Sequence, residues 1–218
     1  MKILKNKKFK LIITVSSLLC IYILINAYTY TLAVSQDLQK SVFRLHVIAN
    51  SNSVQDQNLK YIVRDNIIEY MKTICDNSKS KEETIQIVSD HLDDFTNIAN
   101  QTIKDQGFSY EATAQIGNFE FPTKTYGDIS FPSGYYDALK IQIGEAKGQN
   151  WWCVLYPSLC FVNVTSGIVP EESKEDLKES LNEEEYQVIS DSQNPSMQIK
   201  FKVIEFFTQS NIITAKNL

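Results

Sequence analysis

The chain has 218 residues, a formal net charge of −5 and 43% hydrophobic residues, with only 7 Gly and 5 Pro. This composition excludes a fibrous or disordered polypeptide, and the chain is long enough to bury a core without metals or many disulfides. The negative charge argues against nucleic acid as a partner, because an acidic exterior repels a phosphate backbone.

Residues 1–35 are typical of an export segment. Residues 1–10 hold five lysines and no acid, so the rest of a chain of net charge −5 carries −10, and residues 11–25 are almost entirely apolar. The lysines stay on the cytoplasmic side, which places the chain after residue 35 outside the membrane. Two alternatives remain open. The segment is either cleaved after Ala33 or retained as an anchor over residues 11–34, since roughly 20 residues suffice to span.

Residues 42–48 alternate between apolar and polar, which predicts a β-strand with Phe43, Leu45 and Val47 inward. Two amphipathic helices come next. The first is predicted from about residue 54 to 75. The second begins at a capping box of Ser80 and Glu83 and ends at Gly107.

The second half of the chain alternates again in several segments. Strands are predicted at 108–116, at 119–121 after a turn at Gly117-Asn118, at 135–143 and 151–156 as a β-hairpin, and at 197–203. The acidic segment 171–190 is predicted to be helical, with a capping box at Ser180 and Glu183.

This order predicts an α+β fold, in which an antiparallel sheet carries the two consecutive N-terminal helices on one face, after the signal or anchor helix. We expect one extracytoplasmic domain over residues 36–207 and a loose tail over 208–218.

Motifs for catalysis and metal binding are missing from the sequence. It contains no Gly-rich phosphate loop, no His-Glu-x-x-His, no Cys-x-x-Cys and no Gly-x-Ser-x-Gly. The two histidines, His46 and His91, show no clustered spacing, and His91 is expected at the surface. We therefore expect no cofactor and no metal.

Cys153 and Cys160 allow two interpretations. Two cysteines close in sequence and outside the cytosol favour a disulfide, with His46 on the solvent side of its strand. Alternatively, Cys153 is a nucleophile and His46 its base, which would make the protein an extracytoplasmic thiol-dependent or cell-wall enzyme. The disulfide is the stronger expectation, because nothing in the spacing brings Cys153 to His46.

Polar residues gather where the first strand meets the first helix. Asp56, Lys60 and Arg64 recur every four residues, so they share a helix face as solvated ion pairs or as a protein-docking stripe. Trp151 and Trp152 should point to opposite faces of a strand, one into the core and one available to a partner. The residues predicted to contact a partner are Arg44, His46, Asn50, Asp56, Lys60, Arg64, Asp65, Trp151 and Trp152.

Two stretches carry a resemblance to a known family. The first is Phe43-Arg44-Leu45-His46-Val47-Ile48-Ala49-Asn50-Ser51-Asn52-Ser53, and the second runs from Phe131 to Phe161 through Asn150-Trp151-Trp152-Cys153. Over residues 40–207, and in its basic-apolar N-terminus, the chain resembles the stage II sporulation protein R family. The segment 119–130 and the tail do not share the resemblance.

The resemblance implies a signalling protein rather than an enzyme. Members of the family are made in the forespore and exported into the space between the forespore and mother-cell membranes. There they activate a membrane-embedded aspartic protease that processes pro-sigma-E. The expected partner is this protease, and membrane contact is expected through the N-terminal segment. A structural envelope protein without a signalling role is a third alternative.

Overall fold

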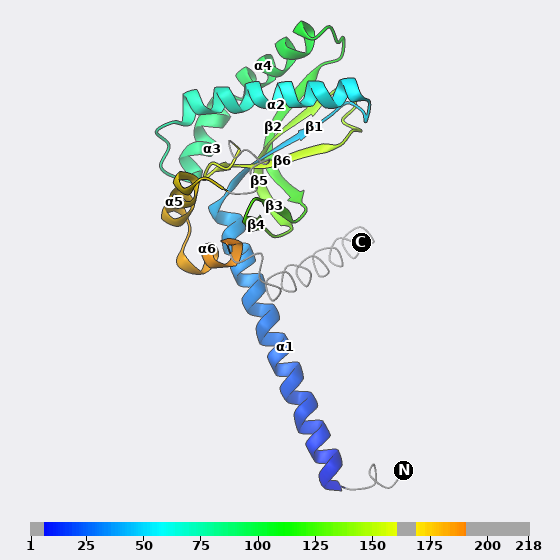
Figure 1. Ribbon diagram of the computed structural model, residues 1–218, viewed down its shortest axis with the longest axis vertical. Coiled ribbons are helices and arrows are strands. Elements are labelled where there is room, and N and C mark those ends of the chain that lie inside the picture. The colour runs from blue at the N-terminus through cyan, green and yellow to red at the C-terminus, as the bar shows by residue number, and fades with distance from the viewer. Residues whose placement is uncertain (1–6, 161–168, 191–218) are drawn as a thin grey trace.

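The computed structural model describes residues 7–160 and 169–190, which form a long N-terminal helix joined to an α+β domain (Figure 1). The helices are α1 (Lys7–Ser41), α2 (Val54–Cys75), α3 (Lys81–Asp90), α4 (Leu92–Asp105), α5 (Glu171–Ser180) and α6 (Glu183–Ser190). The strands are β1 (Phe43–Ile48), β2 (Ala112–Phe121), β3 (Lys124–Tyr126), β4 (Ile129–Phe131), β5 (Gly134–Ile143) and β6 (Asn150–Tyr156). The predicted strand at 197–203 and the tail at 208–218 lie outside the described residues.

The main sheet is mixed and not antiparallel as predicted. Its strand order is β2-β5-β1-β6, with β1 parallel to β5 and antiparallel to β6. The hairpin predicted for residues 135–156 is therefore wrong, because β1 lies between β5 and β6. Alternation along a strand determines which side chains share a face, but it does not determine the neighbouring strand or its direction.

Helices α2 and α4 cover one face of this sheet (Figure 1). Phe43, Leu45 and Val47 are fully buried there, which confirms the inward set of the first strand and the helical layer on one face. The opposite face is not left to solvent as expected. The small β3–β4 sheet lies over part of it, so that Arg44 is also fully buried. His46 is nearly buried beneath the rings of Trp152 and Phe121.

The second predicted helix is divided into α3 and α4 at His91, whose φ of −109° and ψ of 17° interrupt the helix. The His91 side chain is 41% exposed, as expected of a surface residue, and its Nδ1 lies 2.7 Å from Asp94 Oδ2 and 2.9 Å from the Tyr70 hydroxyl. Both predicted ends are confirmed. Ser80 Oγ accepts the Glu83 N–H at 3.1 Å, and Gly107 follows α4 with a φ of +80°.

Gly117 and Asn118 lie within β2 and do not form a turn, because they pair with Ala138 and Asp137 of the equally long strand β5. A Cβ on Gly117 would lie 3.0 Å from the Phe119 ring, so glycine serves close packing at this position.

The acidic segment forms α5 and α6, with the break at Leu181 and Asn182. The capping box begins two residues later than predicted. Asn182 Oδ1 accepts the Glu185 N–H at 2.9 Å, and Glu185 Oε2 accepts the Asn182 N–H at 2.8 Å.

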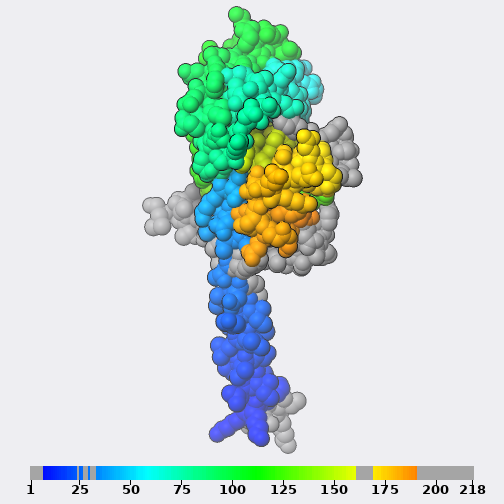
Figure 2. Space-filling view, turned by 90° about the vertical axis from the view of Figure 1, so that its left-hand side faces the viewer, coloured from blue at the N-terminus to red at the C-terminus, as the bar shows by residue number. Residues whose placement is uncertain are grey.

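The last turns of α1 belong to the domain, while the rest projects away from it (Figure 2). Val34, Ser35 and Leu38 are buried, and Ser41 Oγ donates to Glu185 Oε1 of α6 at 2.9 Å. The apolar side chains from Phe9 to Ile23, and that of Ile25, are exposed. Within residues 7–160 and 169–190, no helix combines the length and hydrophobicity that a bilayer crossing requires, so a spanning anchor is not confirmed.

Candidate functional site

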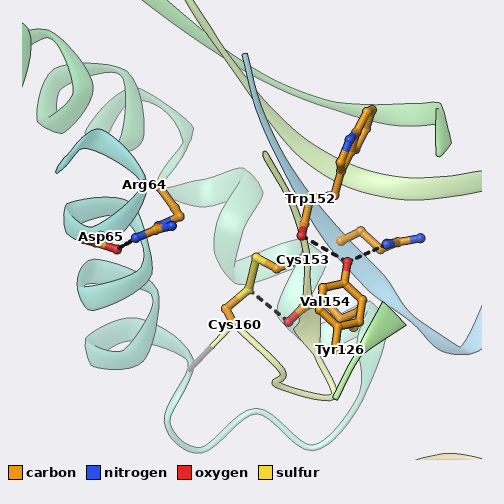
Figure 3. The surroundings of a disulfide bond; sticks show 8 residues. Arg64, Asp65, Tyr126, Trp152, Cys153, Val154 and Cys160 are labelled. Carbon is orange, nitrogen blue, oxygen red and sulfur yellow. Dashed lines mark hydrogen bonds and ion pairs between the residues drawn. A yellow bond between two sulfur atoms is a disulfide. The ribbon is translucent and has the colours of Figure 1, made fainter. Parts of the chain in front are cut away.

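Cys153 and Cys160 are joined by a disulfide with a Cα–Cα distance of 5.4 Å (Figure 3). Cys153 pairs with Leu45 on the helix side of the sheet, whereas His46 points to the opposite face. The structure therefore does not bring together the nucleophile and base of the enzyme hypothesis. Burial, partly offset by a hydrogen bond to Asn150, also lowers the pKa of His46 from 6.5 to about 4, which makes it a weak base.

Cys75 does not replace Cys153 as a reactive thiol. It is half-buried on α2, and burial together with the nearby Glu83 carboxylate raises its pKa to about 11. Among the described residues, no group of three or more His, Cys, Asp or Glu side chains could hold a metal ion.

Asp56 is the centre of a buried hydrogen-bond network where β1 turns into α2. Its carboxylate accepts hydrogen bonds from Asn50 Nδ2, from Ser51 Oγ and from the Tyr110 hydroxyl. Burial by itself would raise the pKa of Asp56, but these hydrogen bonds hold it below its ordinary value. Asp56 is therefore a structural anion and not the solvated ion-pair partner predicted.

Asn50 ties this turn to the loop between β5 and β6. Its Oδ1 accepts the Glu145 N–H at 2.9 Å, and its carbonyl accepts the Lys147 N–H at 3.1 Å. The two segments are so close that a Cβ on Gly148 would collide with the Ser51 carbonyl oxygen. Asn50 thus positions the loop that leads into Trp151 and Trp152.

Lys60 is buried and does not form part of an exposed stripe. Its Nζ donates to Gln57 Oε1 at 2.7 Å and to the Gln149 carbonyl at 3.2 Å. Burial, with a further contribution from Arg64, lowers its pKa. Lys60 is thus a second link between α2 and the β5–β6 loop.

Of the three α2 residues predicted to share a face, Asp56, Lys60 and Arg64, only Arg64 lies at the surface. Its guanidinium carbon lies 4.2 Å from the centroid of the Trp151 ring and 5.0 Å from that of Tyr61, and the two rings meet edge to face at 5.7 Å. Arg64 Nη2 also pairs with Asp65 Oδ1 at 2.6 Å. We call these four residues, Tyr61, Arg64, Asp65 and Trp151, the α2–β6 cluster.

The α2–β6 cluster combines a rigid interior with an exposed outer surface. The Arg64 side chain is only 17% exposed, while the Asp65 side chain is 63% exposed and Tyr61 is also exposed. Aromatic rings and arginine fixed in this way are the residue types that anchor protein interfaces, because little conformational entropy remains to be lost on binding.

Arg44, His46 and Trp152 lie on the other face of the sheet and do not join this cluster. The Arg44 guanidinium carbon is 4.2 Å from the Phe121 ring centroid, and Arg44 Nη2 donates to the Tyr126 hydroxyl at 2.9 Å. That hydroxyl donates to the Trp152 carbonyl at 3.0 Å (Figure 3). Trp152 stacks on His46 with ring centroids 3.6 Å apart. The two tryptophans thus point to opposite faces, as expected, but both are half-buried.

Sequence reasoning missed three tyrosines of these sites. Tyr61 lies three residues before Arg64 on the same helix, so helical spacing alone could have placed it in the cluster. Tyr110 and Tyr126 reach Asp56 and Arg44 from distant segments, and no local pattern marks these contacts.

Comparisons with known proteins agree with the resemblance seen in the sequence. The family model described as stage II sporulation protein R matches residues 39–166. Stage II sporulation protein R of Bacillus subtilis (strain 168) is 33% identical over 186 residues, which cover 80% of this chain and 82% of that protein. The chain belongs to the stage II sporulation protein R family. No solved structure matches it.

The matched residues of this stage II sporulation protein R family member contain the whole of the main sheet. Residues 39–166 include the Asp56 network, the α2–β6 cluster and the disulfide, whereas α5 and α6 follow the match. The family assignment therefore covers every candidate site residue described above.

Proposed function

We propose that this protein is an exported sporulation signal that activates a membrane-embedded aspartic protease, which then processes pro-sigma-E across the space between forespore and mother cell. Family membership and the lysine-headed apolar leader support this proposal. In this proposal the protein acts outside the cytoplasm and is not an enzyme, and residues 11–34 either serve as an anchor or are removed by cleavage.

The α2–β6 cluster is the observation that carries the proposal. It offers a preorganised aromatic and charged surface beside a disulfide-linked strand, whereas Cys153 is bonded and its predicted base faces away. Such a surface suits recognition by contact. A ligand activates a receptor only when it binds the active conformation more tightly than the idle one, and rigid contacts favour this discrimination.

Reconstitution of the full chain with the candidate protease in membrane vesicles tests the proposal, with cleavage of pro-sigma-E as the measurement. We expect cleavage to require this protein. We expect Tyr61→Ala and Arg64→Ala each to reduce the rate by about tenfold, which corresponds to the loss of one interface anchor.

Lys104→Ala is the matched control, because Lys104 is exposed in the last turn of α4, away from β6. It should leave cleavage unchanged. Melting curves of all variants separate a lost contact from a lost fold. Equal cleavage with and without the protein would refute the proposal.

A further inference from the structure

The face of the main sheet that points away from α2 and α4 has an unusual charge composition. In an acidic chain, its strand positions carry two cations and no acid. These positions, which share a face by register, are Thr113, Gln115, Gly117, Phe119 and Phe121 of β2, Gly134, Tyr136, Ala138, Lys140 and Gln142 of β5, Arg44, His46 and Ile48 of β1, and Asn150, Trp152 and Val154 of β6.

The β3–β4 sheet covers only one half of this face. Arg44, Phe121 and Tyr136 are fully buried in that half. In the other half, the side chains are exposed or half-buried. We call this open half the lysine face, and its residues are Gln115, Phe119, Lys140, Gln142, Asn150 and Trp152.

The lysine face has a positive charge that the described part of the chain does not neutralise. Lys140 Nζ lies 4.7 Å from the centroid of the Phe119 ring, and within residues 7–160 and 169–190 no ion pair joins it to a carboxylate. Arg44 lies on β1, the strand next to that of Lys140, and its Nε and Nη1 are buried without a hydrogen-bond partner. Burial, and to a smaller extent the charges of Lys140 and Arg44, lower the pKa of His46. The His46 ring, which lies between the two cations, therefore stays neutral at pH 7.

We propose that the lysine face binds an extended acidic segment of a protein partner. Carboxylates of that segment would pair with Lys140, and the amides of Gln115, Gln142 and Asn150 would bind its backbone. Phe119 and Trp152 would cover its apolar side chains. The inference rests on the proposed function and adds a second contact surface to it. This surface is positively charged and lies on the opposite side of β6 from the α2–β6 cluster.

The two tryptophans of the chain give this proposal a direct test, because they lie on opposite faces of β6. Trp151→Phe leaves Trp152 as the only tryptophan, and Trp152→Phe leaves Trp151. Each single-tryptophan protein is titrated with an end-blocked peptide of alternating glutamate and valine, and with a peptide in which lysine replaces glutamate.

We expect the acidic peptide alone to change the emission of Trp152 saturably, with no change in Trp151. Adding Lys140→Glu should weaken the apparent affinity by at least about tenfold, and Lys140→Met should weaken it less. Lys104→Glu is the control that matches the change in net charge. Circular dichroism and melting curves of each variant confirm that the fold survives.

Any of three results would overturn the proposal. They are no saturable change in Trp152, an equal change in both tryptophans, and an affinity that Lys140→Glu leaves unaltered. The cleavage assay separates this inference from the proposed function. If the natural chain does not stimulate cleavage, the proposed function fails and the titration still decides on the lysine face. If it does, Lys140→Glu should reduce cleavage while Lys104→Glu should not.

Discussion

The buried carboxylate of Asp56 holds three segments of the chain together. It accepts hydrogen bonds from the β1–α2 turn and from Tyr110, which precedes β2. The chain uses this acid as an internal acceptor rather than as a surface charge. Each hydrogen bond to a charged group contributes about 1.5–3 kcal/mol.

Asp56→Asn should therefore lower the free energy of unfolding by about 2 kcal/mol, because the amide cannot accept all three hydrogen bonds. Urea unfolding at pH 7 measures the change. Asp65→Asn is the control, since an exposed ion pair contributes little, and it should alter stability by less than about 1 kcal/mol. Equal losses in the two variants would contradict the central position of Asp56.

Residues with local partners could be predicted from the sequence, whereas those with distant partners could not. Ser80 and Gly107 perform the capping roles expected of them, because each acts within a few residues of itself. Arg44 and His46 were expected on a solvated face, but β3 and β4 cover Arg44, and the rings of Trp152 and Phe121 cover His46. The Asp56–Lys60–Arg64 row separates into a buried network and a surface cluster, because the β5–β6 loop lies over Lys60.

Helix α1 is the element whose two ends differ most. Its C-terminal turns pack into the domain, where Leu38 is fully buried, while Leu18 is 60% exposed on the projecting part. The last turns of α1, from Val34 onward, are thus part of the folded domain.

Leu38→Ala should lower the free energy of unfolding by about 3 kcal/mol, because it leaves a cavity between α1 and the sheet. Leu18→Ala, on the exposed part of the same helix, should change the free energy of unfolding by no more than about 0.5 kcal/mol when both proteins are measured in one detergent. Chemical denaturation of the two proteins provides the comparison. A neutral Leu38→Ala would mean that α1 is not part of the core.

The strands of the main sheet and most of the helices could be predicted from periodicity, but β3, β4 and the arrangement of the elements could not. Both ends of α2 agree with the sequence prediction, since its apolar spacing is long and uninterrupted. The parallel pairing of β1 with β5 joins segments that α2, α3, α4 and β2 separate in sequence, and strand patterns carry no information on such distant pairing.

The whole domain should lose stability in mild acid because of His46. The folded state lowers its pKa from 6.5 to about 4, so between these pH values the unfolded chain binds a proton that the folded chain does not. Stability is therefore full above about pH 6.5 and falls toward pH 4 by up to about 3 kcal/mol. Below that range, Asp56 and Asp137, whose pKa values are lowered, add to the loss.

His46→Gln should flatten this dependence between pH 6.5 and 4 and keep the steeper loss at lower pH. Urea midpoints at several pH values test the expectation. Parallel profiles for the natural chain and the variant would show that His46 is not responsible.

The unbroken course of α1 has a mechanical consequence for the whole molecule. Its 35 residues extend about 50 Å at ~1.5 Å per residue, and their last turns are fixed to the sheet. In a chain that retains residues 7–33, one continuous helix therefore fixes the distance and orientation of the sheet relative to the N-terminal end of α1.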